Sequence, residues 1–310
     1  MSGKPAILRA AKLPESNRLE LDAAFDVHVL PEDAGAAAEL LDKVGGSIRG
    51  IAVRKTHIDR ALIDRLPALE IIASYSAGTE NIDVAHARAR GIAVTNTSHI
   101  LAEEVANLAL ALVLSLTRDV ITADRFVRDG RWTDGPFPLT RSLNGMAVGI
   151  VGFGHIGSAI ARRLDVVGAR VHYCGPNRKP VAYPYHADAL ALAEAVEVLI
   201  VTCPLTPETR GLIDARVLAA LGPQGYLVNI ARGPIVDEAA VIAALAADGL
   251  AGAALDVFVN EPQVPAALVA DRRVILTPHI GSGTERTRQL MGDATVDALV
   301  EKLGAVPPAR

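Results

Sequence analysis

Three polar side chains, each placed just after an apolar segment, carry the chemistry that this sequence suggests. The apolar segments 227–231, 253–257 and 274–278 are followed by Arg232, Glu261 and His279. If each segment is a strand of one parallel sheet, the three side chains gather at its carboxyl edge, where such sheets bind ligands. An arginine binds carboxylates, and a histidine exchanges protons near neutral pH. The pattern therefore predicts a site for a keto acid.

A glycine-rich turn lies between an apolar segment, 147–151, and an amphipathic one that ends near Leu164. Gly152 permits a tight turn, Gly154 lets the backbone approach a pyrophosphate, and Gly157 lets a helix pack closely on the strand. Ordinary turns between a strand and a helix match the same spacing. Here the apolar strand before the turn and the helical pattern after it both favour dinucleotide binding.

The loop after the next strand, 170–174, bears on the choice of cofactor. Folds selective for NAD usually end this strand in an acidic residue that binds the adenosine ribose. This chain instead continues Gly175-Pro-Asn-Arg-Lys179. A carboxylate would repel a 2′-phosphate, whereas Arg178 can bind one through charge-assisted hydrogen bonds. The sequence predicts NADP(H) in preference to NAD(H), with Asn177, Arg178 or Lys179 at the phosphate; the alternative is a solvated basic loop.

The composition indicates an ordinary α/β enzyme. The chain has 310 residues, a formal net charge of −4 and a pI near 6.1, so no broad basic surface points to nucleic acid. The most apolar stretch, 105–116, is too short to span a bilayer and is expected to be a buried helix. The two cysteines, Cys174 and Cys203, show no metal-ligand spacing. We expect small core thiols, no metal site, no membrane partner and a cytoplasmic location.

Strands that alternate with helices predict parallel sheets in two α/β blocks. In the first block we expect strands at 6–8, 25–29, 50–53, 70–73 and 92–94. In the second we expect them at 147–151, 170–174, 198–202, 226–230, 252–256 and 273–277. A long helix from about 102 to 127 leads between the blocks, and a last helix, 285–303, is expected to pack back on the first block. The predicted domains are therefore residues 1–98 with 284–310, which is discontinuous, and residues 99–283.

Several of these segments together resemble the D-isomer-specific 2-hydroxyacid dehydrogenase family, over nearly the whole chain. They are the glycine motif, Cys203-Pro-Leu-Thr-Pro-Glu-Thr209, Asn229 to Glu238, Leu255 to Phe258, Glu261-Pro262, and Thr277-Pro-His279-Ile-Gly281. The segment from Ser76 to Asp83 resembles that family's carboxylate-binding loop. The branch of NADPH-dependent glyoxylate/hydroxypyruvate reductases is most similar, because it too lacks the ribose-binding acid. The resemblance implies a doubly wound NAD(P)-binding domain and a smaller, flavodoxin-like substrate domain.

The resemblance also implies roles for individual residues. Arg232 orients the carboxylate and carbonyl of a small 2-oxoacid such as glyoxylate or hydroxypyruvate, helped by the N–H groups of Ala77 and Gly78. His279 gives a proton to the carbonyl oxygen as hydride reaches the carbon, and Glu261 holds His279 and favours its charged form. The implied cofactor contacts, besides the glycines and the 177–179 loop, are His155, Ile156, Cys203, Pro204, Thr209, Ile230, Ala231, Arg232, Asp256, His279 and Gly281.

Other functions of the same fold stay open from the sequence alone. Oxidation of phosphite or another small acid uses the same architecture, although the family's formate enzymes carry glutamine where Glu261 stands. A nucleotide-sensing corepressor or scaffold also keeps the fold. The family forms homodimers through the cofactor domain, and residues 130–143 suit a dimer arm. Arg54 and Lys55 follow a strand of the first block and either select a polar or anionic substrate tail or are solvated.

Overall fold

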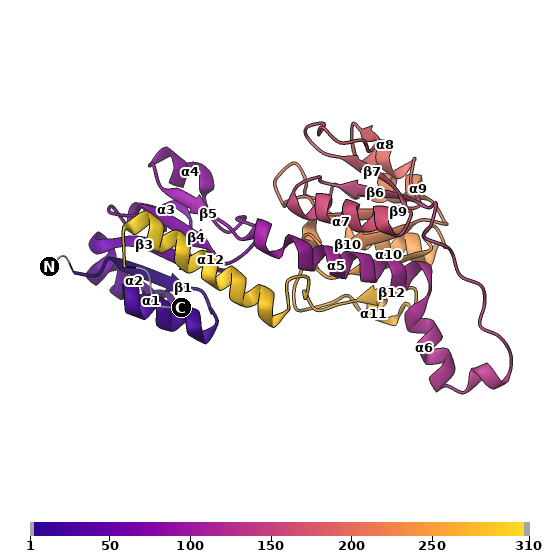
Figure 1. Ribbon diagram of the computed structural model, residues 1–310, viewed down its shortest axis with the longest axis horizontal. Coiled ribbons are helices and arrows are strands. Elements are labelled where there is room, and N and C mark those ends of the chain that lie inside the picture. The colour runs from indigo at the N-terminus through magenta and orange to yellow at the C-terminus, as the bar shows by residue number, and fades with distance from the viewer. Residues whose placement is uncertain (1–2, 307–310) are drawn as a thin grey trace. The chain divides into compact units, whose positions relative to one another are not determined.

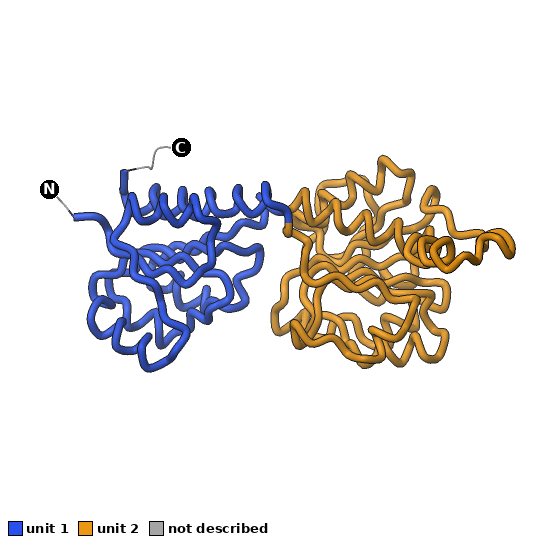
Figure 2. Tube along the Cα trace, turned by 90° about the horizontal axis from the view of Figure 1, so that it is seen from below, with its two compact units in different colours: residues 1–101, 284–310 blue, residues 102–283 orange. Residues whose placement is uncertain are grey.

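The structure of the chain, a computed structural model, describes residues 3–306 and divides into two compact units. Unit 1 consists of residues 1–101 and 284–310, and unit 2 of residues 102–283 (Figure 2). Each unit is built on one parallel sheet with its own apolar core. The fold is α/β, as the alternation of strands and helices predicts.

Unit 1 holds a five-stranded parallel sheet in the order β2-β1-β3-β4-β5 (Figure 1). This order is the flavodoxin-like variant of the doubly wound fold. The strands are β1 (Ala6–Ala10), β2 (Asp26–Val29), β3 (Ile48–Val53), β4 (Ile71–Ser74) and β5 (Ala93–Thr95). The central strands β3 and β4 are almost wholly buried and apolar, as expected where helices cover both faces.

The helices of unit 1 include one from the far end of the chain. They are α1 (Glu15–Ala24), α2 (Ala34–Val44), η1 (Gly45–Ser47), α3 (Arg60–Asp64), α4 (Val84–Ala89) and α12 (Glu285–Leu303). The last of these has the bounds that the sequence predicts, and it packs on β3, β4 and α1. A buried polar contact fixes this packing, because the Asn17 amide of α1 donates to Asp293 of α12 over 2.7 Å.

Unit 2 holds a seven-stranded parallel sheet in the order β12-β11-β10-β9-β6-β7-β8 (Figure 1). The strands are β6 (Ala147–Val151), β7 (Arg170–Cys174), β8 (Tyr185–His186), β9 (Val198–Val201), β10 (Tyr226–Asn229), β11 (Gly252–Leu255) and β12 (Val274–Leu276). The chain leaves β6 toward β7 on one side and later returns to β9 on the other. The strand order therefore reverses between β6 and β9, which is where doubly wound sheets bind ligands.

The helices of unit 2 connect these strands. They are α6 (Val120–Arg128), η2 (Arg131–Thr133), α7 (His155–Val166), α8 (Ala189–Ala193), α9 (Ala215–Leu221), η3 (Gly233–Ile235), α10 (Glu238–Ala246) and α11 (Ala266–Ala270). Helix α5 (Ser98–Thr117) contains the boundary between the units. It is long and apolar enough to cross a membrane by length and composition, but half of that apolar stretch is buried in the protein.

The single helix predicted for residues 102–127 is wrong, because two helices occupy this stretch. Helix α5 ends at Thr117 and α6 starts at Val120, with Asp119 between them in a left-handed conformation at φ 48°. The Thr117 hydroxyl donates to the carbonyl of Val113 over 2.9 Å, a local bond that competes with regular helix propagation. The short strand β8 was also not predicted, since two residues carry no periodic signal.

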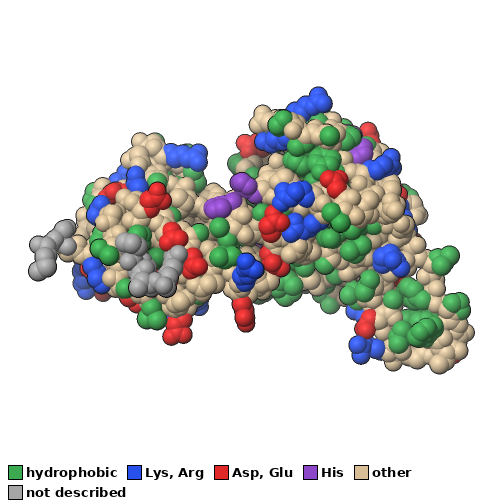
Figure 3. Space-filling model, viewed as in Figure 1, with side chains coloured by type: hydrophobic (Ala, Val, Ile, Leu, Met, Phe, Trp, Pro, Cys, Tyr) green, Lys and Arg blue, Asp and Glu red, His purple; other side chains and the backbone are tan. Residues whose placement is uncertain are grey.

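Residues 120–143, which we call the arm, leave the body of unit 2 and return to it before β6. The arm has a small aromatic contact of its own, with the rings of Phe126 and Phe137 5.3 Å apart and Arg131 over the Phe126 ring at 4.9 Å. Much of its apolar surface stays outside, as the green side chains at the lower right of Figure 3 show. Trp132 is 67% exposed and Leu139 is completely exposed.

Candidate active site

His279 and Glu261 form a pair beyond the carboxyl ends of β11 and β12. The Nδ1 atom of His279 lies 2.8 Å from one carboxylate oxygen of Glu261 and 2.9 Å from the other. A carboxylate only accepts hydrogen bonds, so Nδ1 carries the proton of this contact. The other ring nitrogen, Nε2, is then the atom that can exchange a proton with a ligand. The side chains are 39% and 26% exposed, so the pair is reachable from solvent.

The backbone around His279 is held by one buried carboxylate, Asp256. Its Oδ1 accepts from the Thr277 hydroxyl at 2.7 Å and from the N–H of Ile280 at 2.8 Å, while its Oδ2 accepts from the N–H of Gly281 at 2.9 Å. Asp256 is 1% exposed. These contacts hold His279 in a left-handed conformation, φ 54°, which side chains other than glycine rarely adopt. The sequence indicated Asp256 as a cofactor contact but gave no sign of this positioning role.

Arg232 follows β10 and is presented by a turn that Asn229 organises. The buried Asn229 amide donates to the carbonyl of Arg232 over 3.1 Å, and its oxygen accepts from the N–H of Ala231 at 3.1 Å. The next residue, Gly233, packs against the neighbouring loop so closely that a Cβ there would lie 2.0 Å from the carbonyl carbon of Phe258. The Arg232 side chain is half-buried, and its Nη1 donates to the carbonyl of Ala231.

The glycine turn after β6 has the geometry that a pyrophosphate requires. Gly152 has φ 95°, and a Cβ there would lie 2.7 Å from the N atom of Cys203. At Gly157 a Cβ would lie 2.3 Å from the carbonyl oxygen of Gly152, so the helix needs glycine to pack on the turn. By contrast, a Cβ on Gly154 would meet no protein atom within 4 Å. Packing does not explain glycine at that position, whereas close approach of a pyrophosphate to the start of α7 does.

The basic loop after β7 is fastened at both ends by tyrosine hydroxyls. Tyr185 donates to the carbonyl of Gly175 over 3.0 Å. At the other end, the N–H of Lys179 donates to the Tyr173 hydroxyl over 2.8 Å, and that hydroxyl donates to the Lys179 carbonyl over 3.3 Å. Asn177, Arg178 and Lys179 themselves are exposed. The loop therefore presents its polar side chains on a fixed backbone.

Ala77 and Gly78 lie in unit 1, in the loop that follows β4. Both residues are half-buried, and the Ser74 hydroxyl donates to the carbonyl of Gly78 over 3.5 Å. Within the described part of unit 1, no acceptor takes the N–H group of either residue. Two adjacent backbone N–H groups without an acceptor in this part of unit 1 can donate to a carboxylate ligand.

The comparisons with known proteins agree with this geometry. A family model described as the NAD binding domain of D-isomer specific 2-hydroxyacid dehydrogenases matches residues 110–281. The chain belongs to this family. It is therefore an NAD(P)-dependent oxidoreductase of the D-2-hydroxyacid dehydrogenase class, and the glycine turn after β6 belongs to its nicotinamide dinucleotide domain.

Two curated relatives are reductases of 2-oxoacids. A glyoxylate/hydroxypyruvate reductase of Arabidopsis thaliana is 45% identical over 262 residues, which is 84% of each chain. A 2-ketogluconate reductase of Gluconobacter oxydans is 39% identical over 97% of this chain and 96% of its own. The solved structure of an NADPH-dependent glyoxylate/hydroxypyruvate reductase from Sinorhizobium meliloti, in complex with NADP and malonate, superposes with a TM-score of 0.87. It is 41% identical and covers 99% of this chain and 97% of its own.

The remaining predicted cofactor residues of this dehydrogenase lie beside the switch point of the sheet. Cys203 and Pro204 follow β9, and the Thr209 hydroxyl donates to the Pro204 carbonyl over 2.7 Å, which folds the segment back on itself. Ile230 and Ala231 follow β10 and are buried. His155 and Ile156 begin α7. Burial raises the pKa of Cys174 to about 12 and that of Cys203 to about 11, so both are neutral thiols at physiological pH.

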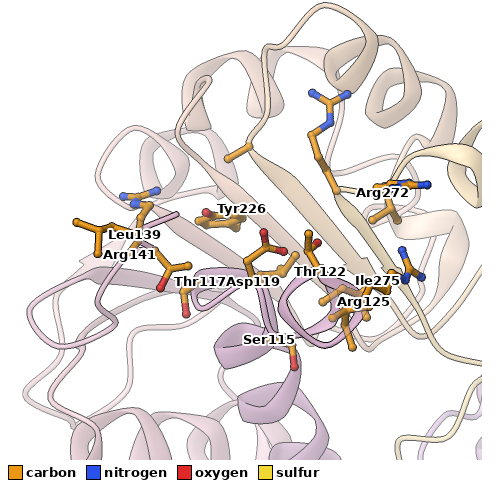
Figure 4. Close-up of a pocket in the computed structure, with 16 residues that line it drawn as sticks. Ser115, Thr117, Asp119, Thr122, Arg125, Leu139, Arg141, Tyr226, Arg272 and Ile275 are labelled. Atoms are coloured by element: carbon orange, nitrogen blue, oxygen red, sulfur yellow. The ribbon is translucent and has the colours of Figure 1, made fainter. Parts of the chain in front are cut away.

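A cavity of about 410 Å³ in the dehydrogenase lies at the opposite, amino edge of the unit 2 sheet (Figure 4). Tyr226 at the start of β10 and Ile275 of β12 line it, together with Arg125, Leu139 and Arg141 of the arm. None of the predicted site residues lines this cavity. Within residues 3–306 no group of three or more His, Cys, Asp or Glu side chains is arranged to hold a metal ion.

Proposed function

We propose that this dehydrogenase reduces small 2-oxoacids, such as glyoxylate or hydroxypyruvate, to D-2-hydroxyacids with NADPH. The observation that carries the proposal is the contact of His279 Nδ1 with both oxygens of Glu261. This contact leaves Nε2 as a proton donor beyond the strand ends, where a dinucleotide domain places its reacting carbon. We assign residues 99–283 to dinucleotide binding, and residues 1–98 with 284–310 to substrate binding.

The protein's own residues orient, polarise and protonate the substrate in this proposal. Nicotinamide, when bound, supplies the hydride. Arg232 neutralises the substrate carboxylate and polarises the carbonyl oxygen, and the N–H groups of Ala77 and Gly78 bind carboxylate oxygens. His279 donates its Nε2 proton to the carbonyl oxygen as hydride reaches the carbon. Glu261 stabilises the imidazolium that donates, and Asp256 keeps the ring in place by fixing the backbone of residues 279–281.

Preference for NADPH is supported by the end of β7, where Gly175 stands in place of an acidic residue. Three polar side chains follow in a loop whose backbone is fixed by Tyr173 and Tyr185. Arg178 is the residue that we place against the 2′-phosphate, with Asn177 and Lys179 beside it. A solved relative that is 41% identical to this chain, an NADPH-dependent reductase in complex with NADP, supports the preference for NADPH.

We also propose that the enzyme is a homodimer formed through the cofactor domain, with the arm in the interface. Trp132, Leu139 and Val127 are exposed apolar side chains on one projection of unit 2, and a second copy of the chain would bury them. The two free, buried cysteines suit a reducing compartment, and we place the enzyme in the cytoplasm.

Loss of NADPH absorbance with glyoxylate or hydroxypyruvate tests the proposed reaction. The wild-type enzyme should turn over both, with D-glycerate as the product from hydroxypyruvate. His279→Ala should lower kcat by about 10²- to 10⁴-fold, the usual contribution of a general acid, and leave NADPH affinity nearly unchanged. Near-normal turnover by this variant would remove His279 from the mechanism. If neither oxoacid is reduced, oxidation of phosphite is the next reaction to measure, and NADPH binding without any turnover would indicate a nucleotide-sensing protein.

A further inference from the structure

Arg54 and Tyr75 stand side by side at the carboxyl edge of the unit 1 sheet. Strands β3 and β4 are in register, with Val53 opposite Ser74, and each of these residues ends its strand. Arg54 and Tyr75 are therefore neighbours across the two strands. The N–H of Tyr75 donates to the Val53 carbonyl over 2.8 Å, which carries the pairing to the strand ends. The Ala77–Gly78 loop leaves the same edge.

A second arginine, Arg288 in the first turns of α12, joins this pair. The hydroxyl of the buried Tyr75 donates to the Arg288 carbonyl over 3.0 Å, and the Arg54 guanidinium lies over the Tyr75 ring at 5.9 Å. Both arginine side chains are half-buried. Burial lowers the pKa of Arg54, and repulsion by the Arg288 charge lowers it further. The Arg288 backbone thus lies at the Tyr75 hydroxyl and the Arg54 guanidinium over the ring of the same tyrosine, and the Arg288 charge acts on Arg54.

Arg54 and Arg288 stand outside the ion pairs of the described part of unit 1. Some other arginines of unit 1 form ion pairs, for example Arg49 with Glu70 at 2.5 Å and Arg65 with Asp42 at 2.6 Å. In the described part of unit 1, no carboxylate forms an ion pair with Arg54 or Arg288. Two half-buried like charges repel each other, and an anion between them would relieve that repulsion.

The backbone that carries Arg54 is fixed independently of its side chain. The Asn81 amide donates to the Thr56 carbonyl over 2.6 Å and to the Arg54 carbonyl over 3.4 Å. Asn81 belongs to the segment that follows Ala77 and Gly78, so one loop both carries these N–H groups and holds the Arg54 backbone. The spacing between the Arg54 backbone and the Ala77–Gly78 loop is therefore set by the fold of unit 1.

We propose that Arg54 and Arg288 form a subsite for a second anionic group on the substrate, so that the preferred 2-oxoacids carry a carboxylate or a phosphate on the tail. The proposal rests on the proposed function, in which Ala77 and Gly78 bind the carboxylate next to the keto group. A guanidinium pair binds either anion through charge-assisted hydrogen bonds, and a neutral tail offers it no compensating charge.

Matched pairs of substrates test the subsite. Oxaloacetate is compared with 2-oxobutyrate, and 2-oxoglutarate with 2-oxovalerate, because each pair has the same chain length and differs in tail charge. 3-Phosphooxypyruvate provides the phosphate arm. We expect kcat/KM for the anionic member to exceed that for the neutral member about tenfold or more. Hydroxypyruvate is the neutral member for 3-phosphooxypyruvate, and the pair with the largest ratio shows whether the subsite prefers a carboxylate or a phosphate. Equal values within every pair would overturn the proposal.

Substitution then locates the preference. Arg54→Met should bring the ratio of anionic to neutral kcat/KM close to one, and the ratio is informative because a general loss of activity cancels in it. Arg288→Met should act in the same direction. Lys55→Met is the matched control, since Lys55 is the adjacent but exposed cation, and it should keep the wild-type ratio. A ratio that survives Arg54→Met, or that Lys55→Met lowers equally, would contradict the assignment.

A binding measurement separates this proposal from the proposed reaction. Malonate should raise the melting temperature of the NADPH-bound enzyme more than propionate at equal concentration, and Arg54→Met should abolish the difference. This result does not depend on turnover. An enzyme that reduces glyoxylate without any selectivity for charged tails or for malonate would keep the proposed function and lose the subsite. Selectivity for malonate in an enzyme that reduces no oxoacid would support the anion subsite and contradict the proposed reaction.

Discussion

The imidazole Nδ1 of His279 lies 2.8 Å and 2.9 Å from the two carboxylate oxygens of Glu261, although 17 residues separate them in sequence. The contact joins two loops that follow adjacent parallel strands, β11 and β12. Because both loops leave the same edge of the sheet, the fold brings an acid and a base together that neither strand could supply alone. The contact fixes which ring nitrogen faces a ligand.

Removal of the Glu261 charge should slow catalysis without loosening the cofactor. Glu261→Gln keeps the shape of the side chain but loses the charge that stabilises the imidazolium. We expect kcat for glyoxylate reduction to fall about tenfold or more, with little change in the dissociation constant of NADPH. Glu238→Gln is the control, because the Glu238 carboxylate lies nearby and accepts from the Val259 N–H over 2.7 Å. Equal losses in both variants would show that Glu261 acts only on loop structure.

Asp256→Asn should damage stability and catalysis together. The buried carboxylate accepts three hydrogen bonds, and an amide presents one acceptor and one donor group in the same space. At least one buried N–H or O–H then loses its partner, which costs about 1–3 kcal/mol of unfolding free energy. The kcat should also fall, because the backbone at His279 is no longer held in its left-handed conformation. Urea unfolding and steady-state kinetics measure the two effects.

Thr277→Val offers a graded comparison, since it removes only the 2.7 Å hydroxyl contact and leaves both N–H contacts of Asp256 in place. Its effects should be smaller than those of Asp256→Asn in both measurements. If Asp256→Asn proves as stable and active as the wild type, the positioning role is wrong.

The sequence predicted the strands of this site and the polar residues that follow them better than it predicted the hydrogen bonds that hold those residues in place. Strands 147–151 and 170–174 have the predicted bounds, because a continuous apolar run in the first and alternating apolar residues in the second, each between turns, leave few alternatives. Arg232, Glu261 and His279 were predicted as site residues because they follow such strands, and the structure brings Glu261 and His279 into contact. Asp256 was indicated as a cofactor contact, and its hold on residues 277–281 depends on contacts between positions 21 to 25 apart in sequence, which no local pattern records. The break at Asp119 was missed for a similar reason, since the apolar periodicity continues on both sides of it.

The tyrosines behind the 175–179 loop should affect NADPH but not NADH. Tyr173→Phe removes the hydroxyl that contacts Lys179, and Tyr185→Phe removes the contact to Gly175. Each change frees one end of the loop and so raises the entropic cost of placing its cations around a phosphate. We expect KM for NADPH to rise severalfold, with KM for NADH and kcat nearly unchanged. Tyr183→Phe is the control, because the Tyr183 hydroxyl contacts Asp165 and neither end of the loop.

An equal rise of both Michaelis constants in Tyr173→Phe or Tyr185→Phe would mean that the tyrosines support the whole adenosine site. Unchanged constants would mean that the loop needs no support.

Cofactor choice itself should reverse with two substitutions at the end of β7. A Cβ on Gly175 would lie 3.9 Å from the N atom of Phe153, an ordinary van der Waals contact, so an aspartate fits without displacing the backbone. Gly175→Asp places a carboxylate that repels a 2′-phosphate and accepts from ribose hydroxyls. Arg178→Ala removes a cation whose bonds to phosphate are worth roughly a tenfold to hundredfold preference. The double variant should therefore use NADH better than NADPH, mainly through KM, because the 2′-phosphate lies far from the reacting carbon.

Arg216→Ala, at an exposed arginine on α9, is the control for this reversal and should keep the wild-type preference. Initial rates with both cofactors at saturating glyoxylate measure the ratio, and a wild-type enzyme that uses NADH as well as NADPH would show that the loop is only a solvated turn.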